Sequence, residues 1–580
     1  MLPTFCGVIL FFIPFVLIFN FRDKVEGFLY VFTSLIALHI LVALFTQVFH
    51  VFSYGLIIGI HFLISSFCLI FFFYKQKYFS RAKLNSLVLI SFAIIGFELL
   101  SVHYFYTGTV SETERSNVVF RDFYAYPFYS DEWVGVSLAD YSIENKSLPF
   151  ANPLWHDTPF ANGLVVFYSF ISELFLLFNL APLTGWSLFA IMNGLLISLL
   201  LYLLLRVNNV NNFSSSIATL SVPWIVNGTN LPGIWFLTPF IFSLSLFITF
   251  LICLSKREFL LGMTTSIICL LLYPPIIVLV FPTLLFYILK NKISLYYLFS
   301  IGAVGVIIIA ILSINFGYSR AIGFVYSSLI RPNLDGGIVS MPFWIVLPIL
   351  LIPIILFGLI IMIKKKSYTL LVPIIIGLFF WFLYAFVSKI IILEQSRVVA
   401  ITSVLLMIPI GFGIESIVNL IKNQKTVNFI KVLFILAFVV AALFYPGSNR
   451  WSKLVLKIKT DNGYQDFFPS APVTRYLQSD DLKFFSSFSK KRFLSLPWKG
   501  LVIGTATHNY PLDSKDSTIT NKFVNYAEFM QRTCEEKSAY ARDFKIEYVY
   551  SDSFDCPSFE ELGSSQEGFH LYRPISHIVL

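Results

Sequence analysis

Long apolar runs dominate this chain, and short clusters of Lys and Arg separate them. A helix needs about 20 mostly apolar residues to cross a bilayer, because it rises about 1.5 Å per residue through a hydrocarbon core about 30 Å thick. Runs of roughly this length recur about 14 times, so the pattern predicts a mainly α, polytopic transmembrane helical bundle. The predicted spans are Leu2–Phe21, Gly27–His50, Val51–Tyr74, Leu84–Phe105, Trp186–Leu205, Ser214–Val226, Ile234–Leu254, Phe259–Tyr273, Pro275–Leu289, Ile293–Ile314, Pro342–Ile363, Tyr368–Ser388, Val398–Ile421 and Phe429–Tyr445.

The distribution of cations between the runs predicts their orientation, because short cytoplasmic loops are enriched in Lys and Arg. Every second connection between predicted spans lies on the same side of the membrane. The connections on one side hold 17 Lys and Arg residues, and those on the other side, counted up to the C-terminal tail, hold 7. This unequal distribution of cations between the two sides requires that one further apolar run, Gly163–Leu180, does not cross the membrane. This run contains Glu173 near its middle, and we expect it to lie in or dip into the outer interface. The N-terminus and the C-terminal tail are then both non-cytoplasmic.

The composition agrees with a multi-pass protein of the cell membrane. Hydrophobic residues make up 57% of the chain and charged residues 13%, whereas soluble domains have about 25% charged residues. A net charge of +9 would otherwise suggest a nucleic-acid partner. The excess lies in the predicted cytoplasmic loops, and the sequence has no nucleic-acid-binding motif, so we expect no such partner.

The same pattern predicts three parts of the chain. Residues 1–105 form an N-terminal segment of four spans, and residues 106–446 form a membrane domain with a large external loop at 106–162. Residues 447–580 mix short β-like runs (Leu501–Thr505, Ile546–Tyr550 and Gly568–Tyr572) with amphipathic stretches, which indicates a small non-cytoplasmic α/β domain. Two cysteines of this tail, Cys534 and Cys556, either form a disulfide or remain free thiols.

The external loop carries the most informative carboxylates. Ser130 is a suitable N-cap for a helix that opens with Asp131 and Glu132. Carboxylates at this place also complement the helix dipole, which is an equal alternative for Glu132. Asp131 lies in an aromatic-rich, weakly charged loop, where a carboxylate can serve as a general base or a metal ligand. His156 and Asp157 follow in a proline-bounded turn, which is either part of a site or a plain surface turn.

Four stretches occur in an informative order: the acidic pair in SDEW, the non-crossing run GLVVFYSFISELFLLFNLAPLTGW, the span SLFAIMNGLLISLLLYLLLRV that ends in Arg, and the later EQSRVVAITSVLLMIPIGFG. This order resembles the GT-C superfamily of membrane glycosyltransferases, which includes protein O-mannosyltransferases, the aminoarabinose transferase of lipid A and oligosaccharyltransferase catalytic subunits. The resemblance covers most of the chain in layout but rests on few residues. The chain departs from the family in having four spans before the acidic loop, where one is common. The tail has no WWDYG-like sequence, which weighs against protein N-glycosylation.

The resemblance implies a glycosyltransferase that moves a sugar from a polyprenyl-phosphate-linked donor to a glycan, lipid or protein acceptor of the cell envelope. Asp131 is then the expected catalytic base, with Glu132 as a helper or substitute. The departing lipid phosphate needs cations, and Arg397 is the first choice because its guanidinium can bind phosphate with two hydrogen bonds. Cations at span ends also simply reach toward lipid headgroups, which is the alternative for Arg397.

Other residues are expected to bind substrate. They are Lys389 and Arg331 for the phosphate, and His156 with its neighbour Asp157 for the sugar or the phosphate. Membrane lipids surround the bundle, and no cofactor is certain. The sequence leaves open whether a divalent cation takes part.

Two other classes of protein fit parts of the pattern. An O-antigen polymerase or ligase would need several Arg and a His in large late loops, whereas the largest internal loop here is early and acidic. A lipid or solute transporter would show inverted repeats with broken helices. The Tyr273-Pro-Pro275 break has no matching half, and Glu98 and Glu415 are the two carboxylates well inside predicted spans.

Overall fold

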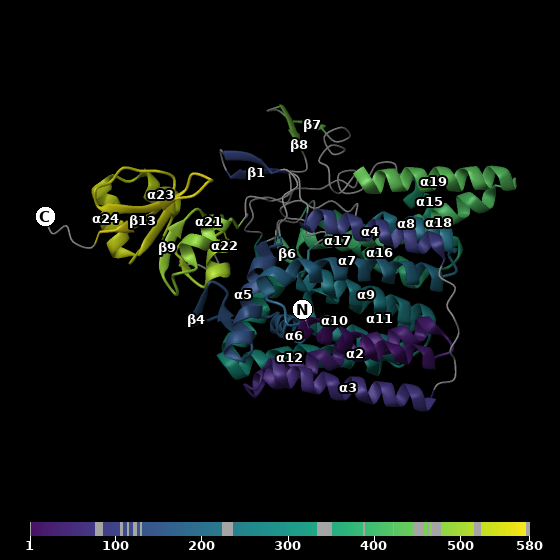
Figure 1. The fold of residues 1–580 in the computed structure, drawn as a ribbon. Helices are drawn as coiled ribbons and strands as arrows, with labels where there is room; N and C mark the ends of the chain where they lie inside the picture. The colour runs from purple at the N-terminus through teal and green to yellow at the C-terminus, as the bar shows by residue number, and fades with distance from the viewer. Residues whose placement is uncertain are drawn as a thin grey trace.

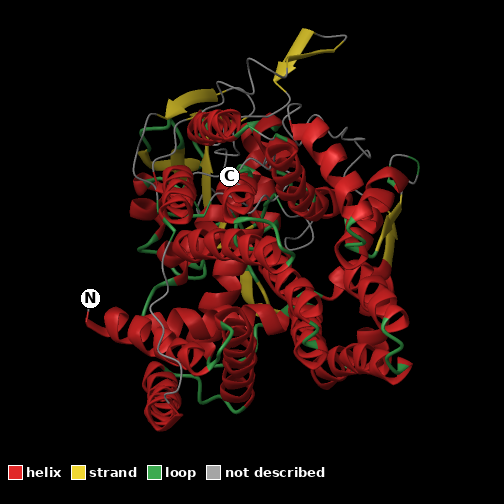
Figure 2. Ribbon diagram, turned by 90° about the vertical axis from the view of Figure 1, so that its right-hand side faces the viewer, coloured by secondary structure: helices red, strands yellow, loops and turns green. Residues whose placement is uncertain are grey.

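The protein is mostly helical and consists of one large helical bundle with a smaller lobe at one end (Figure 1). The computed structural model describes residues 2–75, 85–104, 108–112, 115–119, 125–127, 130–222, 236–332, 351–384, 386, 389–421, 423–444, 457–460, 463–466, 477–515 and 524–575. Among these, strands form only short pieces beside the helical body (Figure 2). The predicted fold class, mainly α with a small sheet-containing domain, is confirmed at this level.

The bundle contains helices from both the N-terminal segment and the membrane domain. The N-terminal segment provides α1 (Leu2–Phe12), the 3-10 helix η1 (Ile13–Asn20), α2 (Lys24–Val48), α3 (Tyr54–Lys75) and α4 (Ser86–Tyr104). The membrane domain provides α6 (Val165–Phe178), α7 (Pro182–Val207), α8 (Asn212–Leu220), α9 (Pro239–Lys256), α10 (Phe259–Leu272), η3 (Pro274–Ile276), α11 (Ile277–Lys290), η4 (Leu295–Leu298), α12 (Phe299–Phe316), α13 (Tyr318–Leu329), α15 (Leu351–Lys364), α16 (Tyr368–Leu383), α17 (Gln395–Leu405), α18 (Met407–Leu420) and α19 (Gln424–Phe444).

Six helical stretches in the described residues are long and apolar enough to cross a membrane. They are Pro3–Asn20, Lys24–Val48, Tyr54–Lys75, Pro182–Val207, Pro239–Lys256 and Arg397–Leu420. These helices indicate a membrane location. Other predicted spans correspond to apolar helices of 10–17 residues, so the expected number of about 14 full-length spans is not reached in the described part of the chain. The predicted span Ser214–Val226, for example, has only the nine-residue helix α8 among its described residues.

Helix α6 lies inside the bundle among other helices, and the placement of Gly163–Leu180 in or dipping into the outer interface stays a prediction. Every residue of α6 except Leu176 is buried, and the helix packs against α1, α2, α3, α5, α7 and α10. The fully buried Glu173 is satisfied by two histidines of neighbouring helices rather than by water or lipid headgroups. A carboxylate can be buried in this way because it accepts hydrogen bonds from both partners.

Charged and polar residues at the ends of different helices meet in the structure. Asp23 pairs with Lys256, and Tyr30 donates a hydrogen bond to Glu258 over 3.0 Å. Lys365 lies 3.3 Å from Glu415, which also accepts hydrogen bonds from Asn211. All of these belong to the predicted cytoplasmic connections or the adjoining ends of spans. The external loop and the tail lie together at another end of the bundle (Figure 1).

The external loop contains α5 (Ser130–Asn145), and the described residues also form four small antiparallel ladders. The ladders pair β1 (Gly108–Glu112) with β2 (Arg115–Val119), β3 (Ala151–Asn152) with β4 (Trp155–Pro159), β5 (Ile330–Pro332) with β6 (Lys389–Ile391), and β7 (Lys457–Thr460) with β8 (Gly463–Asp466). The β5–β6 ladder joins two segments of the chain that are distant in sequence.

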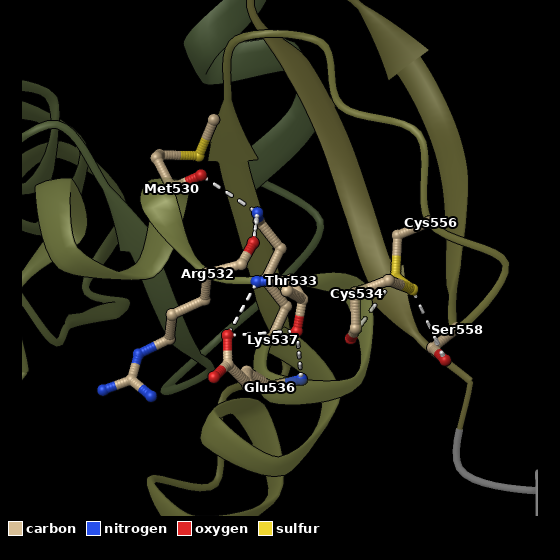
Figure 3. The surroundings of a disulfide bond; sticks show 8 residues. All are labelled: Met530, Arg532, Thr533, Cys534, Glu536, Lys537, Cys556 and Ser558. Atoms are coloured by element: carbon tan, nitrogen blue, oxygen red, sulfur yellow. Dashed lines mark hydrogen bonds between the residues drawn. A yellow bond between two sulfur atoms is a disulfide. The ribbon is translucent and has the colours of Figure 1, made fainter.

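The tail forms an α/β lobe around a five-stranded sheet with the strand order β10-β9-β11-β13-β12. Its elements are α21 (Ser479–Phe485), β9 (Arg492–Ser495), α22 (Pro497–Thr507), β10 (Tyr510–Pro511), α23 (Tyr526–Gln531), α24 (Cys534–Asp543), β11 (Tyr548–Ser551), β12 (Phe559–Ser564) and β13 (His570–Pro574). The prediction of a β-like run at Leu501–Thr505 is wrong, because these residues are helical and belong to the buried part of α22. Cys534 and Cys556 form a disulfide that ties α24 to the segment before β12 (Figure 3).

The lobe and the membrane domain share one apolar core. Trp133 of α5 and Leu154 of the β3–β4 turn pack with Phe485, Phe493 and Leu501 of the lobe, and all five side chains are nearly inaccessible. Apolar burial of this kind stabilises contact by roughly 25 cal/mol per Å². The lobe is therefore docked on the external loop.

Candidate functional site

Helix α5 places the acidic pair against α7 and the start of α9. It approaches α7 so closely that a Cβ atom at Gly135 would lie 2.4 Å from the ring of Trp186. The backbone of Leu237 is held from both sides, because its N–H donates to Glu132 over 2.8 Å and its carbonyl accepts from Trp186 over 3.1 Å. Tight packing and a clamped backbone fix the position of the N-terminal turn of α5, which carries Asp131.

Asp131 meets Arg397, a residue 266 positions later in the chain. Nη2 of Arg397 lies 3.3 Å from Oδ2 of Asp131, and Nε of Arg397 lies 3.2 Å from Oε2 of Glu394. Nη1 of Arg397 donates to the hydroxyl of Tyr273 over 2.9 Å. The Asp131 and Arg397 side chains are 38% and 22% exposed, so this group is open to a ligand. We call Asp131, Tyr273, Glu394 and Arg397 the arginine cluster.

Each member of the arginine cluster is fixed by its own local structure. Arg397 lies in the first turn of α17, and Glu394 is the N-cap residue of that helix. The hydroxyl of Tyr384 donates to the carbonyl of Leu393 and so holds the segment before Glu394. Tyr273 ends α10, where the following Pro274 breaks the helix because proline has no backbone N–H.

The backbone places Arg331 and Lys389 on two paired strands. In the β5–β6 ladder Arg331 pairs with Ile390, and Pro332 pairs with Lys389. Strand β6 then leads within a few residues to Glu394. The ladder brings together the two segments that carry the additional predicted phosphate-binding cations.

Glu132 is placed differently from Asp131. Its side chain is 1% exposed, and its carboxylate accepts the backbone N–H of Leu237. Adjacent residues of a helix point about 100° apart, so one carboxylate can face inward while the other stays accessible. The structure thus gives Glu132 a backbone partner, and its part as a helper or substitute for the base stays a prediction.

His156 and Asp157 lie in β4, at the contact with the C-terminal lobe rather than in the arginine cluster. Nε2 of His156 is 2.8 Å from the Ser137 hydroxyl, and its ring is 5.4 Å from that of His508. Burial, together with the nearby His508, lowers the pKa of His156 to about 4. His156 is therefore uncharged at neutral pH.

Asp157 binds the lobe through polar contacts. It accepts hydrogen bonds from Tyr510 and from Lys490, whose Nζ lies 2.9 Å away. The hydrogen bond from Tyr510, which has the larger effect, and the one from Lys490 hold the pKa of Asp157 below its usual value. The stacking of Trp155 on Tyr510, with ring centroids 5.1 Å apart, continues the same contact. The described geometry thus gives Asp157 a docking partner in the lobe.

Two groups of side chains among the described residues have the spacing of metal ligands. Glu144, His156 and His508 lie at the lobe contact, and His39, His61 and Glu173 lie inside the bundle. In each group the three ligand atoms lie within 4.8 Å of one another. A divalent cation therefore has two places in the described structure whose donor atoms suit it.

Sequence reasoning did not identify Tyr273 as part of the site. The Tyr-Pro-Pro stretch marks a helix break, and an aromatic residue at such a break was the available signal. His39 and His61 were missed entirely, because each is a single histidine in an apolar run.

No protein-family model matches the chain, and no curated protein matches it. Among solved structures, the chain is similar to archaeal oligosaccharyltransferase AglB from Archaeoglobus fulgidus in complex with an inhibitory peptide and a dolichol-phosphate. The identity is 13%, with a TM-score of 0.44 over 80% of this chain and 69% of that chain. The apo form gives 14% identity and a TM-score of 0.45 over the same shares, and the complex with Zn and sulfate gives 14% and 0.44 over 84% and 73%.

Proposed function

We propose that the chain is a multi-pass membrane glycosyltransferase of the GT-C type. It would move a sugar from a polyprenyl-phosphate-linked donor to a glycan, lipid or protein acceptor at the outer face of the membrane. The observation that carries this proposal is the 3.3 Å contact between Asp131 and Arg397, two residues that were expected at one site and are far apart in sequence. The N-terminus and the lobe would both be non-cytoplasmic, and the domain limits would be 1–105, 106–446 and 447–580.

The arginine cluster has the groups that such a transfer requires. The acceptor hydroxyl attacks the anomeric carbon, the bond from that carbon to the phosphate oxygen breaks, and the lipid phosphate leaves with the electron pair. The hydroxyl proton needs a base, and Asp131 supplies a partly exposed carboxylate. Negative charge grows on the phosphate in the transition state, and the Arg397 guanidinium stabilises it.

The contact between Asp131 and Arg397 also explains how donor binding would prepare the base. An arginine that pairs with a carboxylate can exchange that partner for a phosphate, which matches its planar donor geometry equally well. When the donor phosphate takes this place, the Asp131 carboxylate is released from Arg397 and can accept the proton of the acceptor hydroxyl. Glu394, which contacts Nε of Arg397, keeps the guanidinium oriented during the exchange.

The predicted cations carried by the β5–β6 ladder would complete the phosphate site. Arg331 and Lys389 would offset the two carboxylates Asp131 and Glu394, which together outweigh the single charge of Arg397. A divalent cation could share this task, and His156 with Asp157 would orient the lobe over the site rather than bind the sugar directly.

The proposal is tested with membranes that contain the full chain and a panel of labelled polyprenyl-phosphate sugars. We expect transfer by the wild type and a loss of about 10²–10⁴-fold in Asp131→Asn, the usual contribution of a general base. The matched control is Asp140→Asn on the same helix. Burial and the nearby Glu144 raise the pKa of Asp140 to about 8, so asparagine mimics its protonated form and transfer should persist.

Two results would contradict the proposal in different ways. Unchanged transfer by Asp131→Asn would remove Asp131 as the base while leaving the donor class intact. A correctly inserted wild-type protein that uses no member of the panel would contradict the donor class itself.

A further inference from the structure

A fully buried polar cluster joins three helices inside the bundle. Nδ1 of His39 on α2 lies 2.7 Å from Oε2 of Glu173 on α6, and Nε2 of His61 on α3 lies 2.5 Å from Oε1 of the same carboxylate. The two imidazole rings stack with their centroids 4.5 Å apart. The exposed fractions are 0% for His39 and Glu173 and 2% for His61. We call these three residues the histidine cluster.

Burying such a cluster costs free energy. A carboxylate removed from water loses several kcal/mol of hydration, and ionisable groups inside membrane proteins are rare and mostly functional. Two stacked imidazoles beside one carboxylate cannot both carry a positive charge without repelling each other. Nε2 of His39 is also buried and has no hydrogen-bond partner among the described residues. This nitrogen lies on the other side of the ring from Nδ1, the atom that faces Glu173.

The donor atoms match a transition-metal ion. Two imidazole nitrogens and one carboxylate oxygen form a set of three protein ligands that zinc accepts, with a fourth position left for water. All the ligand atoms lie within 4.8 Å of one another. In a tetrahedral site with bonds of about 2.0–2.1 Å, ligand atoms are about 3.3 Å apart. The two N–O pairs of the cluster therefore need to widen by less than about 1 Å.

We propose that His39, His61 and Glu173 bind one divalent transition-metal ion, with zinc the ion that suits them best. Soft and borderline cations take imidazole ligands, whereas Mg²⁺ and Ca²⁺ prefer sites made of oxygen atoms only. The ion would bridge α2 and α3 of the N-terminal segment to α6 of the membrane domain.

The bridge gives the N-terminal segment a role that the sequence left unassigned. Helix α6 packs against α5, the helix that carries Asp131. One and a half turns before Glu173, the buried Tyr168 lies close enough to Asp131 and Arg397 for both charges to act on it. An ion at the histidine cluster would therefore hold α6 as a rigid support beneath the arginine cluster. The inference stands on the histidine cluster alone and does not depend on the proposed transfer reaction.

The test is the metal content of the full-length protein purified in detergent, measured by elemental analysis with and without prior dialysis against Zn²⁺. We expect about one zinc equivalent per chain in the wild type and close to none in the triple variant His39→Gln, His61→Gln, Glu173→Gln. Glu98→Gln is the matched control, because Glu98 is another buried carboxyl of the bundle outside the cluster. It should keep the metal.

A second control addresses the other group with metal-ligand spacing. His508→Gln removes one of its three members, and the zinc content attributed to the bundle should not change. Loss of all zinc in His508→Gln with retention in the triple variant would overturn the proposal. A wild type that binds no zinc at any concentration would overturn it as well.

The wild type alone provides a readout that does not depend on whether the variants fold. Replacement of zinc by Co²⁺ should give the intense visible absorption of a four-coordinate site, and X-ray absorption should show two imidazole ligands. A six-coordinate spectrum with oxygen ligands only would contradict the histidine cluster as the binding site.

Discussion

The arginine cluster and the histidine cluster use similar groups in opposite surroundings. In the first, the Asp131 side chain is 38% exposed and shares an arginine with Glu394. In the second, Glu173 is completely buried between two histidines. Water can replace a lost partner at the first site but not at the second, so the contact with Arg397 can open for a substrate whereas the contacts of Glu173 cannot. The difference teaches that accessible carboxylates of this chain suit chemistry, while buried ones hold helices together.

The largest effect that would break this comparison concerns Glu173. Replacing it by alanine leaves two buried histidines without their shared partner, and we expect a loss of about 3–5 kcal/mol in the free energy of unfolding. Thermal unfolding of the detergent-solubilised protein measures the loss. Asp131→Asn is the control, with less than about 1 kcal/mol expected for a partly exposed pair. If Glu173→Ala melted like the wild type, the histidine cluster would not be a structural brace.

The next effect concerns the arginine cluster and should appear in the rate instead of the stability. Arg397→Gln removes the group that stabilises the departing phosphate, and we expect kcat to fall by about 10²–10³-fold with an unchanged melting temperature. Arg397→Lys keeps the charge but not the planar fork, so its loss should be smaller. The transfer assay with a labelled polyprenyl-linked sugar measures both. Equal loss of activity and stability in Arg397→Gln would mean that this pair is structural too.

Much of the fold follows from the sequence because helices leave a local signal. Apolar runs predict the helical class, and the more polar tail predicts a separate C-terminal lobe, because these signals depend on neighbouring residues only. Helix length is harder to predict, because the apolar run Ser214–Val226 continues past the last residue of α8 at Leu220. The run at Leu501–Thr505 shows the other weakness. A short apolar stretch fits a strand or a buried helix equally well, and packing in the lobe decides for α22.

The arginine cluster was partly predictable and the histidine cluster was not. Asp131 and Arg397 each stood out, because each is a charged residue in apolar or aromatic surroundings beside the membrane. His39 and His61 gave no such signal, since a single histidine in a span has many explanations. Only the packing of α2 and α3 on α6 brings them to Glu173. The same limit applies to Glu132, whose partner is a backbone N–H that no sequence pattern reveals.

The contact between β4 and the lobe contains a half-buried titratable group, His156, and an exposed one, Asp157. It predicts that the stability of the protein depends on pH. The pKa of His156 is about 4 in the folded protein, lowered by burial and by His508, against about 6.5 in an unfolded chain. Between these values the unfolded chain binds a proton that the folded protein does not bind. Stability should therefore fall as the pH decreases through this window, by at most about 1.4 kcal/mol per pH unit. Melting curves above and within the window measure the slope, and His156→Gln should abolish it.

The smallest effect belongs to Asp157, the neighbour of His156 in β4. Asp157 and Lys490 are 60% and 59% exposed, so Asp157→Asn should change stability by less than about 1 kcal/mol. Hydrogen bonds from Tyr510 and Lys490 lower the pKa of Asp157, and its contribution is lost only as the pH falls from about 3.9 through that lower value. Asp157 thus stays ionised throughout the window in which His156 titrates, and Asp157→Asn should leave the slope of the melting temperature against pH intact. A slope that disappeared in Asp157→Asn would assign the pH dependence to the exposed pair and reverse the comparison at this contact.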